Sequence, residues 1–476
     1  MNRLLVLDVV GLTPRLLEHM PRLRAVAEGG SRAGLGTVLP AVTCSVQATF
    51  LTGLLPRDHG IVGNGWYFRD LGEPLLWRQH HGLVAGEKVW ETIRRERPGY
   101  RVANVCWWYA MGSTADTTVT PRPVYHADGR KDPDCWTWPP SLHDELVERH
   151  GPFPLFTYWG PTAGIASSRW IVAAARDLMP DHDLTLVYVP HLDYALQRFG
   201  PDAPQAAAAA REVDEVLAPL LDDAARTGTT VVALSEYGIT PARRPVDVNR
   251  VLRREGLLHV HHNATGELLD PWTSRAFAVA DHQVAHVYVP DPADRDRVAE
   301  LLAATDGVAE VLDDAGKAEH GLDHDRAGDL VLVAEPDAWF TYYYWLDDAV
   351  APDFARSVEI HKKPGYDPAE LFWDPADRWA KARAVAHVAR KKLGLRSTMR
   401  VVPLDPSPVG GSHGRLPADP ADGPVLLCSD PVGLPEHVPA TQVRDLLVGL
   451  ATGVSRPVPP PEPVRASAGR GASRDG

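Results

Sequence analysis

A hydroxyl and a thiol lie side by side at Thr43 and Cys44, within the stretch PAVTCSVQATFLTG. Both side chains can act as nucleophiles, and the thiol is the stronger one by its intrinsic chemistry. The stretch reads as the end of a loop followed by the start of a helix, where threonine often serves only as a cap. The residues alone therefore leave three roles open: a nucleophilic Thr43, a nucleophilic Cys44, or a helix cap.

Three acidic residues lie at or near the ends of apolar runs of strand length. Asp8 lies in RLLVLDVV, Asp193 ends LTLVYVPHLD, and Glu236 lies in TTVVALSEYG. An acid in such a position is often a helix cap or a loop hydrogen-bonding group. It can also be a ligand, because ligands collect at the carboxyl ends of the strands of an open α/β sheet.

The elements that must position these side chains are strands separated by helices. The strands are buried apolar runs, and the helices include an alanine-rich segment, 205–228, that stops at a glycine. This alternation predicts an α/β fold with a doubly wound, mostly parallel sheet and helices on both faces. The predicted strands are 3–10, 101–108, 184–193 and 229–238.

Charge and composition narrow the class of function. The net charge of −13 disfavours binding to nucleic acid polymers or anionic membranes, which requires clustered basic residues. No apolar stretch is long enough to span a bilayer. The four cysteines are scattered, which fits a reducing compartment. We therefore expect a cytoplasmic protein with a small substrate; the sequence carries no signal for an oligomeric state.

The composition changes twice along the chain. Residues 251–345 read as strand, helix, strand and strand, with 277–290 as one strand, and are predicted to form a smaller inserted α+β cap. The catalytic core would then comprise 1–250 and 346–452. Residues 453–476 are rich in Pro, Gly, Ser and Arg, so a disordered tail is predicted there.

The order of the motifs resembles the alkaline phosphatase superfamily, most closely its nucleotide pyrophosphatase/phosphodiesterase (type I phosphodiesterase) branch. The resemblance covers nearly all of residues 1–450 and depends most on PAVTCSVQATFLTG followed by HGIVGN. A late GSHG and the block HKKPGYDPAELFWDP also match. The resemblance implies an alkaline-phosphatase-like fold in which two metal ions, commonly zinc, lie about 4 Å apart and clamp a phosphoryl group.

The resemblance also implies roles for individual residues. Thr43 would be the nucleophile, forming a covalent phospho-threonine that water then hydrolyses. Asn64 would donate to a phosphoryl oxygen. Asp8 would bind the metal that activates Thr43, and Asp193 and His413 would bind the other metal.

Two positions depart from the family pattern. Gln197 stands where a histidine follows the strand-end aspartate by four residues, and Glu236-Tyr237-Gly238 replaces the usual Asp-His-Gly. Gln197, Glu236 and Tyr237 offer oxygen in place of two imidazole nitrogens. The predicted metal ligands are therefore Asp8, Thr43, Asp193, Gln197, Glu236, Tyr237 and His413, and manganese or iron becomes an alternative to zinc.

Two other sites could replace the missing imidazoles. His191 lies two residues before Asp193, and we expect it on the same strand face. Asp281-His282 forms an Asp-His pair, but Glu236 keeps the family spacing of about forty residues after Asp193, so a structural role in the cap is favoured for the pair.

We expect a metal-dependent phosphodiesterase or nucleotide pyrophosphatase-like hydrolase that acts on a small phosphorylated molecule. The alternative is a pseudoenzyme that binds a phosphate-bearing ligand at a degenerate site, because two imidazoles are missing. A phosphomonoesterase or phosphomutase ranks lower. A sulfatase is excluded, because it needs a Cys-x-Pro-x-Arg pattern, and Val46 and Ala48 stand at the Pro and Arg positions after Cys44.

Overall fold

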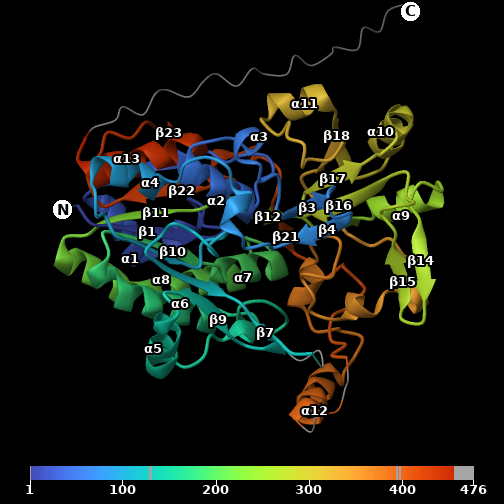
Figure 1. Ribbon diagram of the computed structural model, residues 1–476, viewed down its shortest axis with the longest axis horizontal. Helices are drawn as coiled ribbons and strands as arrows, with labels where there is room; N and C mark the ends of the chain where they lie inside the picture. The colour runs from blue at the N-terminus through green and yellow to red at the C-terminus, as the bar shows by residue number, and fades with distance from the viewer. Residues whose placement is uncertain (1, 128–130, 393–394, 396–397, 455–476) are drawn as a thin grey trace, which may run out of the picture.

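The computed structural model describes residues 2–127, 131–392, 395 and 398–454. Its centre is a nine-stranded sheet in which five of the eight neighbouring pairs run parallel (Figure 1). The predicted doubly wound, mostly parallel sheet is thus confirmed. In spatial order the strands are β23 (His437–Val438), β2 (Ser31–Leu35), β22 (Val425–Cys428), β11 (Thr230–Leu234), β1 (Leu4–Val9), β10 (Leu184–Val189), β5 (Val102–Val105), β6 (Thr117–Pro121) and β9 (Cys135–Trp138).

Helices cover both faces of this sheet, which explains why the central strands are continuous apolar runs. All residues of β1, β10 and β11 are buried. One face carries α6 (Ile165–Leu178), α7 (His191–Phe199) and α8 (Pro204–Thr227), and the other carries α2 (Thr43–Thr52), α4 (Val89–Glu96) and α13 (Val443–Thr452) (Figure 1). As predicted, α8 ends at Gly228, whose φ of 64° suits glycine.

A second, four-stranded antiparallel sheet lies beside the first (Figure 1). Its order is β16 (Phe277–Asp281), β17 (Val284–Tyr288), β19 (Leu330–Ala334) and β18 (Val308–Leu312), accompanied by α10 (Arg295–Ala303) and α11 (Asp314–Glu319). The prediction of one strand over 277–290 is wrong, because the chain reverses after Asp281 and forms a β-hairpin. The turn residues, His282 and Gln283, are none of the usual turn formers such as glycine, proline or asparagine, so the sequence did not reveal it.

The remaining elements are short strand pairs and helices. The 251–345 segment is joined to its surroundings by β13 (Arg244–Val246) and β20 (Ala338–Phe340), which pair in parallel. The predicted boundaries of core and cap remain a prediction. Residues 455–476 of the predicted tail lie outside the described residues. The other elements are β3 (Gly65–Phe68), β4 (Glu73–Leu76), β7 (Val124–Tyr125), β8 (Lys131–Asp132), β12 (Thr240–Pro241), β13 (Arg244–Val246), β14 (Val260–Asn263), β15 (Gly266–Leu269), β20 (Ala338–Phe340), β21 (Gly411–Ser412), α1 (Pro21–Glu28), α3 (Pro56–His59), α5 (Ser141–His150), α9 (Val248–Arg254) and α12 (Ala380–Lys392).

Candidate metal and phosphoryl site

Three neighbouring strands bring the predicted acids together at one edge of the central sheet. Asp8 in β1 is in register with Leu234 at the end of β11 and with Tyr188 in β10. Glu236 follows β11 by two residues. Because parallel strands end at the same edge of a sheet, Asp8 and Glu236 lie next to each other.

Asp193 belongs to the first turn of α7, because β10 already ends at Val189. The expectation that His191 and Asp193 share a strand face is therefore wrong. Two residues apart on a helix, side chains project in different directions. His191 turns to the neighbouring helix, and its Nε2 lies 2.8 Å from a carboxylate oxygen of Glu212. The structure thus does not bring His191 to the site.

Thr43 is the first residue of α2 and is buried. Its Oγ1 lies 3.1 Å from the hydroxyl oxygen of Tyr237. One turn further along the same helix, Gln47 donates from Nε2 to Oδ2 of Asp8 at 2.9 Å, while its Oε1 accepts from the amide of Trp108. Helix α2 therefore supplies the hydroxyl and also holds one oxygen of Asp8.

Asn64 is fixed by three hydrogen bonds, one with the start of α2 and two with Asp281. Its Oδ1 accepts from the Cys44 amide at 3.0 Å. Its own amide and its Nδ2 donate to the two carboxylate oxygens of Asp281, at 2.8 and 3.1 Å. The Cys44 amide sets the orientation of the Asn64 side chain, so Nδ2 has one remaining N–H to offer a ligand.

Asp193 is held by residues at the two positions that depart from the family pattern. Gln197 donates to Oδ2 of Asp193 at 2.7 Å, and the Tyr237 hydroxyl lies 3.5 Å from Oδ1. The other end of Gln197 accepts from the Tyr366 hydroxyl at 2.8 Å. As a metal ligand, Gln197 would have to use the second lone pair of Oε1, because the first already accepts from Tyr366.

His413 is positioned by strand pairing between distant segments. Strand β21, which precedes it, pairs with β12, which follows Tyr237. The rings of Tyr237 and His413 stack with centroids 3.6 Å apart. His413 Nδ1 lies 2.8 Å from the carbonyl oxygen of Ala41, and Nε2 lies 3.9 Å from Oδ1 of Asp193.

Four buried carboxylates in this region, those of Asp8, Asp193, Glu236 and Asp281, have no lysine or arginine partner among the described residues. Two of them lie near imidazoles instead, Asp193 near His413 and Asp281 near His282. Burial raises the pKa of all four, to about 7 for Asp8 and Asp193, and the charge of Asp8 adds to the rise for Glu236. Burying an unpaired ion costs several kcal/mol. The region therefore favours a bound cation.

The unpartnered atoms agree with this requirement. Asp8 Oδ1, both carboxylate oxygens of Glu236 and Nε2 of His413 are buried without a hydrogen-bond partner. Such atoms are rare in proteins unless they bind an ion, a ligand or water. Oxygen and imidazole nitrogen donors fit a divalent metal. The residues present thus fit the metal that the sequence implies.

Cys44 lies beside the site but is unsuited to be the nucleophile. Its side chain packs in a hydrophobic cluster with Ala48 and Ile61. Burial, together with the charge of Asp281, raises the pKa of the Cys44 thiol well above its ordinary value. Since the thiolate is the reactive form, the thiol is inert near neutral pH.

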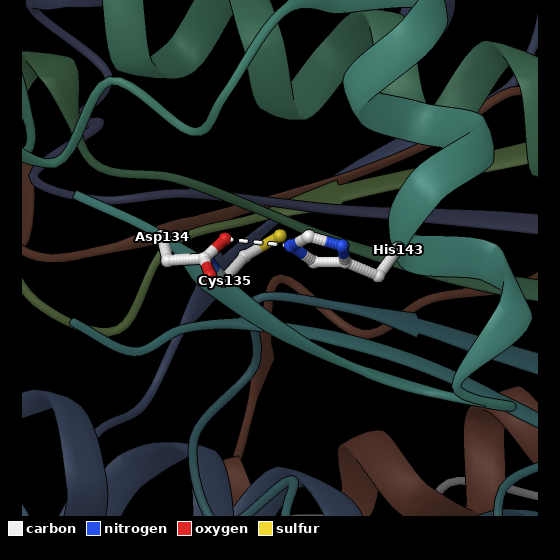
Figure 2. Close-up of side chains that lie close together, drawn as sticks. All are labelled: Asp134, Cys135 and His143. Atoms are coloured by element: carbon white, nitrogen blue, oxygen red, sulfur yellow. Dashed lines mark hydrogen bonds and ion pairs between the residues drawn. The ribbon is translucent and has the colours of Figure 1, made fainter. Parts of the chain in front are cut away.

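A different group, which the sequence did not predict, has the tightest spacing of metal-binding atoms in the described part of the chain (Figure 2). Its members are Asp134, Cys135 and His143, with ligand atoms all within 4.8 Å of one another. Both ring nitrogens of His143 are occupied, by Asp134 at 2.7 Å and Asp144 at 2.9 Å.

The chemistry of this group disfavours a metal. Hydrogen bonds that the carboxylates of Asp144 and Asp134 accept from His143 raise the pKa of His143, which favours an imidazolium without a lone pair. Burial raises the pKa of Cys135 to about 12, so its thiol stays protonated. We therefore assign the group to an ion pair between β9 and α5.

A family model described as type I phosphodiesterase / nucleotide pyrophosphatase matches residues 4–367. The chain belongs to this family. Among curated proteins, an uncharacterized pyrophosphatase/phosphodiesterase of Schizosaccharomyces pombe is 24% identical over 231 residues. That match covers 42% of this chain and 37% of the yeast protein, so the chain spans little more than a third of this relative.

Solved structures support the alkaline-phosphatase-like fold of this chain. Phosphonoacetate hydrolase from Sinorhizobium meliloti 1021, bound to phosphonoformate, has a TM-score of 0.60 at 17% identity and covers 95% of this chain and 96% of its own. Murine ectonucleotide pyrophosphatase / phosphodiesterase 5, as an inactive variant with a threonine replaced by alanine and in complex with AMP, has a TM-score of 0.55 at 14% identity and covers 95% of each chain.

The sequence did not predict three residues that hold the site together. Gln47 orients Asp8, Asp281 binds Asn64, and Tyr366 bonds to Gln197. The four-residue spacing from Thr43 to Gln47 was the one local signal that both face the site. Asp281 and Tyr366 come from segments whose contacts with the site depend on long-range folding.

No helix in the described part of the chain has both the length and the apolarity to cross a bilayer.

Proposed function

We propose that this protein is a metal-dependent hydrolase that cleaves a phosphodiester or pyrophosphate bond of a small molecule through a covalent phospho-threonine. The observation that carries the proposal is the hydroxyl of Thr43, hydrogen-bonded to Tyr237 at the start of α2, beside buried carboxylates that have no lysine or arginine partner among the described residues. Family membership and the fold support the same chemistry.

We assign the candidate ligands to two metal positions. Asp8, Glu236 and the Thr43 oxygen would hold one divalent metal, and Asp193 and His413 would hold a second. When bound, the metals lower the pKa of the Thr43 hydroxyl and neutralise the phosphoryl charge. Zinc is proposed from the family, with manganese or iron as alternatives because Gln197 and Tyr237 replace imidazoles.

The protein's own groups supply orientation and charge stabilisation. The Tyr237 hydroxyl fixes the Oγ1 atom of Thr43, which attacks phosphorus while the bond to the leaving group breaks. The free N–H of Asn64 Nδ2 donates to a phosphoryl oxygen, as does the amide end of α2. Water then cleaves the phospho-threonine and regenerates the hydroxyl. Gln47 and Tyr366 orient Asp8 and Gln197.

The test compares the unmodified protein with Thr43→Ala on bis-p-nitrophenyl phosphate, with zinc, manganese or iron added. The unmodified protein should hydrolyse the diester, and acid quenching during turnover should trap phosphate on Thr43. Thr43→Ala should lose turnover while its circular dichroism spectrum is unchanged. Hydrolysis by the alanine variant at the unmodified rate would refute the role of Thr43.

A second candidate is a pseudoenzyme that binds a phosphate-bearing ligand. It is favoured by one observation: Gln197 and Tyr237 hydrogen-bond to Asp193, which fills part of the second metal position with protein groups. Protein purified without chelator that holds no metal, and that is not activated by added metal, would support this candidate. Cytoplasmic location and a small phosphorylated substrate remain predictions in both cases.

A further inference from the structure

The turn of the β16–β17 hairpin lies against the loop that carries His413. Its two residues, His282 and Gln283, connect Asp281 to Val284. The Gln283 amide donates to the carbonyl oxygen of His413 at 2.9 Å. His282 has a φ of 61°, a left-handed conformation that costs a non-glycine residue about 1–3 kcal/mol and is often found at functional sites.

The hydrogen bonds of His282 leave one ring nitrogen free. Its Nδ1 lies 2.8 Å from Oδ1 of Asp281, a carboxylate that can only accept, so Nδ1 carries the proton. Nε2 therefore bears a lone pair, and it is buried without a partner. By contrast, His286 in the same hairpin has both nitrogens occupied, by Val62 and Gly328.

His413 shows the same arrangement. Its Nδ1 donates to the carbonyl oxygen of Ala41, and its Nε2 is also buried without a partner. The rings of His282 and His413 lie with centroids 3.8 Å apart at an angle of 37°. Histidines that bind metals usually donate the other ring nitrogen to a carboxylate or a carbonyl in this way.

We propose that His282 is a metal ligand, which binds the same ion as Asp193 and His413 and supplies the imidazole that the family pattern has at position 197. The inference rests on the proposed metal-dependent function. A set of two imidazoles and one carboxylate suits a borderline cation such as zinc.

The neighbourhood of His282 supports this assignment. Tyr366 stacks on the His282 ring with centroids 3.6 Å apart, and its hydroxyl bonds to Gln197. His282 is thus connected, through Tyr366, to the side chain that stands in the position of the missing histidine. Gln197 then serves as a positioning residue that holds Oδ2 of Asp193.

The distances require a local adjustment when an ion binds. His413 Nε2 and Asp193 Oδ1 are 3.9 Å apart, but the ligand atoms of Asp193, His282 and His413 do not all lie within 4.8 Å of one another. A rotation of the Asp193 or His282 side chain has to close the set. Asp281 also binds Asn64, so the bond that fixes the His282 ring belongs to the network at the start of α2.

The experiment is a cobalt(II) and zinc titration of the full-length protein after removal of bound metal. His282→Asn retains a side-chain N–H that can reach Asp281 but lacks the Nε2 donor. Its zinc affinity, measured by competition with a chromophoric chelator, should fall at least about tenfold. The cobalt absorption between about 500 and 650 nm, which reports N/O ligands in a low-coordinate site, should weaken or shift.

His191→Asn is the matched control, because His191 is also buried but points to Glu212. It should retain the affinity and spectrum of the unmodified protein. Adding Gln197→His to His282→Asn should restore affinity, which a merely misfolded variant would not do. Unchanged metal binding by His282→Asn, or weakened binding by His191→Asn, would overturn the assignment.

If His282→Asn does not fold, a crystal structure of the unmodified protein loaded with zinc tests the same assignment. Anomalous scattering from a zinc-loaded crystal should place an ion about 2.0–2.1 Å from His282 Nε2. An ion on Asp193 and His413 with no bond to His282 would overturn the inference and leave the proposed hydrolase standing. If the unmodified protein binds no metal, both the His282 assignment and the proposed metal-dependent hydrolase are refuted.

Discussion

The hydroxyl oxygen of Tyr237 lies 3.1 Å from Oγ1 of Thr43, the side chain proposed as nucleophile. Burial raises the pKa of Tyr237 well above its ordinary value, so the phenol stays protonated and acts through hydrogen bonds. In the family pattern this position holds an imidazole. Here a neutral hydroxyl reaches the nucleophile instead.

Tyr237→Phe should therefore lower kcat about ten- to a hundredfold, because Thr43 loses the group that orients its oxygen. KM and metal content should change little. Steady-state kinetics with bis-p-nitrophenyl phosphate measures kcat and KM, and elemental analysis measures the metal content. Loss of bound metal from Tyr237→Phe would instead identify Tyr237 as a ligand, and an unchanged kcat would contradict the orienting role.

Cys44→Ala should decide which of the adjacent residues Thr43 and Cys44 is the nucleophile. Turnover should stay within about twofold of the unmodified protein, because the buried thiol is protonated and faces a hydrophobic cluster. The free energy of unfolding should fall by about 1 kcal/mol through the lost packing. A loss of turnover as large as that of Thr43→Ala would show that the thiol takes part in the reaction.

Removal of metal should destabilise the protein at pH 8, because Asp8 and Glu236 are adjacent buried acids that then lose the cation compensating their negative charge. A ligand at one hundred times its Kd contributes about 2.7 kcal/mol, so chelation should lower the Tm of this 476-residue chain by about 2–3 °C. Thermal melts with and without added zinc measure the difference.

Asp8→Asn and Asp134→Asn form a pair of variants for this melt. Asp8→Asn should abolish most of the dependence of Tm on zinc. Asp134→Asn, in the ion-paired group of Figure 2, should retain it. The opposite pattern would place the metal at Asp134, Cys135 and His143.

Acid should destabilise the protein through buried neutral histidines. Burial lowers the pKa of His286 to about 4, whereas an unfolded histidine titrates near 6.5. Between these values the unfolded state binds the extra proton, so stability is full above pH 6.5 and falls as pH drops towards 4. The loss from His286 alone is on the order of 3 kcal/mol.

Urea denaturation at several pH values tests this prediction with His286→Gln. The glutamine cannot titrate, so the free energy of unfolding should fall less steeply with acid than in the unmodified protein. The absolute stability of the variant at neutral pH can be lower, because the amide of Gly328 loses its imidazole acceptor. Equal slopes for the two proteins would contradict the prediction.

Lys363→Met should be one of the more damaging single substitutions outside the site. Lys363 Nζ is buried 2.7 Å from both Asp367 Oδ2 and Glu370 Oε1. Without the cation two carboxylates remain buried, at a cost of about 3–5 kcal/mol. Lys381→Met on the exposed face of α12 is the control and should change stability by less than about 0.5 kcal/mol. Urea unfolding measures both, and similar values would contradict the importance of the buried cluster.

The sequence by itself determined the architecture and half of the site. The apolar strands that end near Asp8, Asp193 and Glu236 define a mostly parallel sheet, because a strand buried on both faces has no polar alternation. The order of Asp8, Thr43, Asn64 and His413 along the chain was sufficient for the family. These features are local or ordered along the chain, so no contacts are needed to recognise them.

Only the tertiary structure decided which imidazoles and carboxylates meet. His191 was expected on the strand face of Asp193 and points away, because β10 ends four residues earlier than expected. Asp281 and His282 were expected to serve the cap, yet a hairpin turn brings them to Asn64 and His413. Such contacts join residues more than a hundred positions apart, and side-chain periodicity carries no information about them.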